Sequence, residues 1–129
     1  MNTTERIERR KHERFSVSRD VFVALRPDYG KVGQVIDISL GGLAFAYMAN
    51  GRSPSRSSEL DIFSADRSFS LQRVPFRTTS DFESDKIPFS SVRMRRSGLQ
   101  FGNLASSQKS QLEYLIQNHT NGEVKESER

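Results

Sequence analysis

The feature that most constrains this chain is a series of short apolar segments with the two-residue period of β-strands, separated by turn residues. The segment 21–25 alternates apolar and other positions, and the Pro- and Gly-containing stretch 27–30 predicts a turn after it. Further strand candidates follow along the chain, at 32–39, 43–48, 60–63, 69–82, 89–96 and 99–101. Pro75 lies inside the longest of them, which predicts a sheet edge or a bulge there.

One segment has the period of a helix, roughly from Ser106 to His119. Its apolar stripe consists of Leu112, Leu115 and Ile116, which is the pattern of a helix with one buried face. Ser106 or Ser107 can cap its start, and the Asn-Gly pair at 121–122 predicts a stop. Many short strands followed by a single helix indicate a mostly β protein, an antiparallel β-barrel with a C-terminal helix.

The 129 residues suit a single domain, for which we expect three parts. Residues 1–14 are dense in charge and predict a flexible arginine-rich arm. Residues 15–119 form the barrel and its helix. Residues 120–129 are predicted to be a disordered tail.

The composition narrows the classes of function. The chain has no cysteine, so disulfides and zinc–thiolate sites are excluded. Its first residues lack the apolar core of a signal peptide, no apolar run could span a bilayer, and we therefore expect a cytoplasmic protein without membrane insertion. The formal net charge of +4 favours anionic partners.

The sequence contains few of the residue patterns that are typical of enzymes. The two histidines, His12 and His119, lie in the predicted arm and at the end of the predicted helix. No nucleophile motif, paired carboxylates or metal-ligand cluster stands out. We expect a protein that is not an enzyme and that holds no metal and no cofactor.

A first candidate for ligand binding is the arginine-rich run in the predicted arm. Arg10 and Arg14 form an Arg-x-x-x-Arg pair, and Arg9 precedes it. The guanidinium fork matches phosphate oxygens and the O6/N7 edge of guanine, and its flat face stacks on bases. Taken alone, such a run is usually a solvated tail, and Arg6 with Arg10 has the same spacing.

A second candidate is an Asp-x-Ser-x-x-Gly segment at the end of a predicted strand, formed by Asp37, Ser39 and Gly42. These residue types build tight turns, which is the commoner role. They could also serve a ligand: Asp37 could orient an arginine or accept from guanine N–H groups, and Ser39 could donate to a phosphate. Gly42, which lacks Cβ, could let a ligand approach the backbone.

The two motifs in this order, with a strand between them, resemble the PilZ domain family. The resemblance continues in Arg96-Ser97-Gly98-Leu99-Gln100-Phe101, which is similar to a late strand of the family, and in the closing helix. It implies a six-stranded antiparallel β-barrel with a C-terminal helix, and a bacterial receptor for the second messenger cyclic di-GMP.

The resemblance also implies roles for individual residues. Arg10 and Arg14 would bind phosphate and guanine, with Arg9 assisting, and Asp37, Ser39 and Gly42 would hold the other side of the ligand. Arg96 is a secondary candidate for packing against a base. Ligand binding would order the arm and regulate docking to a protein partner that the sequence does not identify.

Another reading remains open, a small β-barrel that binds single-stranded nucleic acid. Such a protein needs a basic groove with exposed aromatic rings. A cluster of Arg93, Arg95 and Arg96 favours this reading, but the nine Phe fall mostly at strand positions expected in the core. A pure interaction adaptor is also compatible with the sequence.

Overall fold

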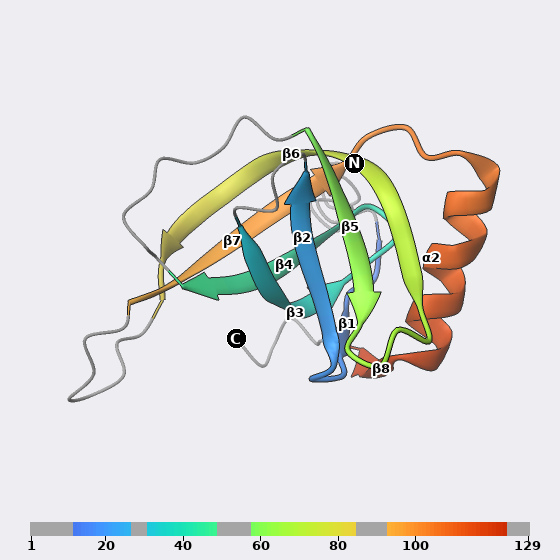
Figure 1. Ribbon diagram of the computed structural model, residues 1–129, viewed down its shortest axis with the longest axis horizontal. Coiled ribbons are helices and arrows are strands. Elements are labelled where there is room, and N and C mark those ends of the chain that lie inside the picture. The colour runs from blue at the N-terminus through green and yellow to red at the C-terminus, as the bar shows by residue number, and fades with distance from the viewer. Residues whose placement is uncertain (1–11, 27–30, 49–57, 85–92, 124–129) are drawn as a thin grey trace, which may run out of the picture.

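The computed structural model describes residues 12–26, 31–48, 58–84 and 93–123. These residues form eight strands and one helix: β1 (Phe15–Val17), β2 (Val21–Arg26), β3 (Val32–Ile38), β4 (Gly42–Met48), β5 (Glu59–Ser64), β6 (Ser70–Glu83), β7 (Met94–Phe101), α2 (Ser106–Asn118) and β8 (Thr120–Glu123). The mostly β class with a C-terminal helix is confirmed (Figure 1).

Six of the strands close into an antiparallel barrel. They neighbour one another in the order β2-β5-β6-β7-β4-β3, and β3 pairs back onto β2. The predicted six-stranded barrel is therefore confirmed. Closure leaves none of these six strands as the free end of the sheet.

Strand β3 shares one edge between two partners. Its first half pairs with β2, where Val23 faces Gly33, and its second half pairs with β1, where Ser16 faces Asp37. The segment that leads into β1 therefore enters the fold beside the predicted ligand residue Asp37.

The inward positions of the strands fill the barrel. Phe45, Ile38, Leu60 and Ile62 are fully buried, and burying each such side chain contributes about 1.5–3 kcal/mol. Gly33 makes room for the largest of them, because a Cβ at this position would meet the Phe45 ring at 2.5 Å.

Strand β6 is long and bent, and it changes partner near Pro75, the predicted irregularity. Its first half pairs with β5 and its second half with β7. Before the bend, Arg73 adopts a φ of 56° within a register shift of the β5–β6 pair. The Asp61 carboxylate accepts the backbone N–H of Arg73 at 3.0 Å and the Nε–H of Arg26 at 2.7 Å. Asp61 therefore stabilises the bulge.

Helix α2 buries Leu112 and Leu115 against the barrel. The predicted caps Ser106 and Ser107 were wrong, because the helix begins at Ser106 and its N-cap is Ala105, which has no side-chain acceptor. The Gln108 side chain replaces the missing cap: it accepts from the Ala105 N–H at 2.9 Å. It also donates to backbone carbonyls of β6, so it ties the helix to the barrel.

The predicted boundary of the disordered tail at residue 120 was also wrong. Thr120–Glu123 forms β8, which pairs with β1, and the Ser18 N–H and hydroxyl both donate to the His119 carbonyl, at 2.9 and 2.8 Å. The edge of β1 that faces away from β3 offers these backbone partners, which a polar sequence does not reveal. Residues 124–129 lie outside the described part of the chain.

Tyr47, Asp81, Arg95 and Lys31 form a polar cluster. The Tyr47 hydroxyl and the Arg95 guanidinium donate to the Asp81 carboxylate at 2.6 and 2.7 Å, and Lys31 lies 4.4 Å from the centre of the Tyr47 ring. Burial and the hydrogen bond to Asp81 raise the pKa of Tyr47 to about 12. Burial opposes ionisation of Asp81, but the hydrogen bonds from Tyr47 and Arg95 outweigh it and lower its pKa.

We expect Asp61→Ala to lower the free energy of unfolding by about 1–3 kcal/mol, because it leaves the Arg73 N–H without this acceptor. Urea unfolding followed by circular dichroism measures the change. The control is Glu59→Ala on the same strand, whose carboxylate is 3.6 Å from the guanidinium of the exposed Arg73 and is itself partly exposed, and which should change stability by less than about 0.5 kcal/mol. Equal effects of the two changes would contradict this role of Asp61.

Tyr47 predicts a loss of stability at alkaline pH. An unfolded tyrosine ionises near pH 10, whereas folded Tyr47 has a pKa of about 12, so its contribution is complete below pH 10 and is lost as the pH rises toward 12. Unfolding midpoints measured from pH 9 to 12 should fall less steeply for Tyr47→Phe than for the wild type. Parallel pH profiles would refute the prediction.

Candidate ligand-binding site

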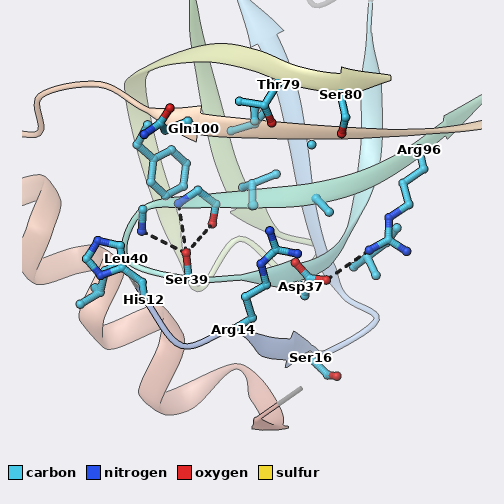
Figure 2. Close-up of a pocket in the computed structure, with 18 of the residues that line it drawn as sticks. His12, Arg14, Ser16, Asp37, Ser39, Leu40, Thr79, Ser80, Arg96 and Gln100 are labelled. Atoms are coloured by element: carbon cyan, nitrogen blue, oxygen red, sulfur yellow. Dashed lines mark hydrogen bonds and ion pairs between the residues drawn. The ribbon is translucent and has the colours of Figure 1, made fainter. Parts of the chain in front are cut away.

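A pocket of about 1200 Å³ lies on the outer face of the barrel (Figure 2). Its walls come from β3, β4, β6 and β7 and from the segment that leads into β1. Pockets for small molecules usually measure about 300–1,000 Å³, so this one has room for a ligand larger than a simple metabolite.

The pocket exists because small residues meet at its floor. Gly98 of β7 pairs with Ala44 on one side and with Ser80 on the other, and all three line the pocket. A Cβ on Gly98 would meet the Ser80 hydroxyl oxygen at 2.7 Å. Because these outward positions have small side chains or none, the outer surface of the barrel is recessed there between the larger residues around it.

The predicted residue Asp37 lies in this pocket because of a register shift in β3. Val35 faces the buried Phe45, and the pairing then shifts by one residue, so that Asp37 faces Ala44. A one-residue shift turns a side chain to the other face of a sheet. Without the shift, the Asp37 carboxylate would point into the apolar interior.

Asp37 lies between two of the predicted arginines. Its Oδ2 lies 3.3 Å from Nη2 of Arg96, across β4. Figure 2 shows the Arg14 side chain pointing toward Asp37 from the opposite side. The side chain of Asp37 is almost fully buried, and a buried carboxylate needs such positive partners. The site therefore holds one anion between cations.

Ser39 shapes the turn between β3 and β4. Its hydroxyl oxygen accepts the N–H groups of Gly41 and Gly42 at 3.0 and 3.2 Å, and its own N–H donates to the Gly42 carbonyl at 2.8 Å. The motif therefore has the turn-building role that its residue types indicate. Ser39 also lines the pocket, and its hydroxyl is engaged in the turn (Figure 2).

Gly42 lines the pocket as well, but the packing of the strands already requires a glycine there. A Cβ on Gly42 would collide with the backbone carbonyl oxygen of Leu99 in β7. The neighbouring Gly41 differs, since a Cβ there would meet the ring of His12, which lies over the turn.

The structure therefore gathers five of the predicted site residues around one pocket: Arg14, Asp37, Ser39, Gly42 and Arg96. The other two, Arg9 and Arg10, lie outside the described residues. Within the described ranges, no group of three His, Asp or Glu side chains could hold a metal ion, and no helix is long and apolar enough to cross a membrane.

Sequence reasoning missed Phe82, whose ring lines the pocket and is 50% exposed. Thr78 of β6 faces the buried Leu99, and strict alternation would turn Phe82 inward too. A register shift between Thr78 and Ser80 instead places Phe82 opposite Arg96 on the outer face. Leu40, at the tip of the turn, is a second exposed apolar residue at the pocket.

The basic cluster that favoured nucleic-acid binding is divided by the barrel wall. Arg95 faces the Asp81 carboxylate, whereas Arg96 faces Asp37 on the outer surface. Two of the three arginines are therefore held by carboxylates on different faces and do not form one continuous basic groove.

A sequence model of the PilZ domain matches residues 8–118. A search of curated protein sequences finds no significant match. Among solved structures, the chain is similar to the PilZ domain of YcgR from Escherichia coli with cyclic di-GMP. The TM-score is 0.62 at 16% identity, over 86% of this chain and 91% of that one.

Two longer proteins share the fold. The transcription regulatory factor MrkH, described as dependent on cyclic di-GMP, has a TM-score of 0.60 at 16% identity, over 85% of this chain. The inhibitor of motility MotI/DgrA from Bacillus subtilis has a TM-score of 0.56 at 20% identity, over 84% of this chain. The matches span 50% of each of these two longer chains.

We expect Gly42→Ala to lower the free energy of unfolding by about 1–3 kcal/mol in the absence of any ligand, because the new methyl group collides with the β7 backbone. Gly41→Ala is the matched control, since it meets only the movable His12 ring and should change stability by less than about 0.5 kcal/mol. Thermal or urea unfolding of both variants measures the difference. A Gly42→Ala protein as stable as Gly41→Ala would contradict the packing role of Gly42.

Proposed function

The chain belongs to the PilZ domain family, and we propose that it is a receptor that binds cyclic di-GMP in the pocket on the outer face of its barrel. The observation that carries the proposal is the convergence of Arg14, Asp37 and Arg96 on one wide pocket, beside the turn built by Ser39. Residues far apart in the sequence meet there in the combination that an anionic purine nucleotide requires.

The chemistry of the ligand fits these residues. Cyclic di-GMP carries two phosphates and two guanines, so it can engage several guanidinium groups at once. We assign Arg14, together with Arg9 and Arg10 of the preceding segment, to its phosphates and guanine edges. Asp37 accepts guanine N–H groups, and the backbone at Ser39 and Gly42 borders the ligand.

Apolar surface at the pocket supports a purine ligand as well. Phe82 offers an exposed ring and Leu40 an exposed aliphatic side chain on the pocket walls. A base that covers either one removes apolar area from water, and stacking on an aromatic ring stabilises a bound base by about 1–3 kcal/mol. These residues add affinity that charge alone does not supply.

We further propose that binding orders the segment before β1 and couples it to a protein partner. Fixing a residue costs about 1–2 kcal/mol, and each charge-assisted hydrogen bond returns about 1.5–3 kcal/mol. His12 and Arg14 lie along the pocket and give the ligand a first anchor on this segment. Ordering of this segment would be the signal that a partner reads.

Calorimetric titration with cyclic di-GMP tests the function and the site together. We expect measurable binding by the wild type and about 10- to 100-fold weaker binding by Arg14→Ala, which loses charge-assisted hydrogen bonds, and by Ser39→Ala, which loses the hydroxyl that holds the turn beside the ligand. Arg19→Ala is the matched control, since Arg19 is exposed and does not line the pocket. It should bind like the wild type.

Absence of binding tighter than millimolar by the wild type would refute the proposed ligand. Wild-type affinity in both variants would refute the residue assignments. A single-stranded oligonucleotide forms the last arm of the titration. Binding to it that is tighter than to cyclic di-GMP, and that falls steeply with salt, would favour the nucleic-acid reading.

A further inference from the structure

We propose that Arg96 sets the base selectivity of the pocket by holding the Asp37 carboxylate in a fixed orientation. In this role Arg96 is a positioning residue, which acts on the ligand through Asp37. The inference rests on the proposed cyclic di-GMP site and adds how that site distinguishes guanine from other bases.

The path between the two side chains is the first support. Asp37 is on β3 and Arg96 on β7, with β4 between them. In the register, Asp37 faces Ala44 and Arg96 faces Ala46. Two successive outward positions of β4 therefore carry only methyl groups, and the Arg96 side chain crosses β4 to reach Asp37 (Figure 2).

The unequal exposure of the pair is the second support. The Asp37 side chain is 6% exposed, whereas that of Arg96 is 35% exposed. A carboxylate that has lost its water depends on the cations and donors around it, and an arginine that still contacts water depends far less on its partner. The contact therefore constrains Asp37 more than it constrains Arg96.

The chemistry of the bases gives the contact a function. An ionised carboxylate only accepts hydrogen bonds. Guanine presents N–H donors from its ring and its amino group on one edge, whereas the same edge of adenine presents a ring acceptor beside its amino group. A carboxylate held in one orientation favours guanine, and one that is free to turn away loses that preference.

Direct contact of Arg96 with a phosphate predicts a different result. The phosphates of cyclic di-GMP and cyclic di-AMP are identical, so losing a phosphate contact weakens both ligands by the same factor. Losing the orientation of Asp37 changes the ratio of the two affinities. This ratio is therefore a readout that a purely electrostatic or structural role of Arg96 leaves unchanged.

The experiment measures the affinity of the full chain for cyclic di-GMP and for cyclic di-AMP. We expect Arg96→Met to reduce the preference for cyclic di-GMP by about tenfold or more, and Asp37→Asn to do the same. Arg96→Lys, which keeps a cation near Asp37, should retain most of it. The double variant, which combines Arg96→Met with Asp37→Asn, should lose no more preference than Asp37→Asn alone.

A second variant keeps the charge of Arg96 and obstructs the path of its side chain across β4. Ala46→Leu puts a bulky side chain on β4 opposite Arg96, outside the residues that line the pocket, and should also lower the preference for cyclic di-GMP. Arg93→Met is the control, because Arg93 is exposed and outside the pocket, and it should leave the ratio unchanged.

The outcomes separate this inference from the proposed function. If the wild type prefers cyclic di-GMP and Arg96→Met weakens both ligands equally, or weakens neither, the positioning role is overturned while the receptor function stands. If Arg96→Met does not fold, an unchanged ratio in Ala46→Leu overturns it. If the wild type binds neither ligand, the receptor function itself fails.

Discussion

The site depends on a register shift of a single residue in β3. Before the shift Val35 faces the core, and after it Asp37 points outward while Ile38 is again buried. The same event in β6, between Thr78 and Ser80, turns Phe82 outward. Strict alternation would leave a carboxylate inside the barrel, where it costs several kcal/mol, and a smoother outer wall. Two irregularities in otherwise regular strands thus produce both the charge and the apolar surface of the pocket.

Barrel closure holds these irregular strands in place. Because β3 pairs with β4 on one edge and with both β1 and β2 on the other, it cannot slip to restore regular alternation without breaking three pairings. The floor of small residues, Ala44 with Gly98 and Ser80, then leaves the outer face open where Asp37 emerges. The strands that are fixed by barrel closure are also the strands that form the pocket. This arrangement suits a site that must present fixed groups to a ligand.

Much of this fold could be predicted from the sequence, since alternation, turn residues and one helical stripe were enough for a barrel with a C-terminal helix. Spacing along the chain, through a family resemblance, also singled out five residues that line one pocket in the structure. Phe82 was missed because a bulge reverses its direction, and periodicity cannot locate a bulge. β8 was missed because Thr120–Glu123 is polar and forms a strand through its pairing with the backbone of β1. The sequence explained Gly42 only by ligand approach. It could not show that a Cβ there would collide with Leu99, because Leu99 lies on a strand distant in sequence.

The pairing of β1 with β8 joins the two ends of the described fold. Phe15 faces Glu123, so the chain enters beside the place where it leaves. The chain that precedes Phe15 and the chain that follows Glu123 therefore start as neighbours. The effective concentration of one segment near the other is therefore high. Even a weak affinity between the two segments would then produce an intramolecular contact. Chain attached at Glu123 therefore starts close to Arg14, which directly precedes Phe15.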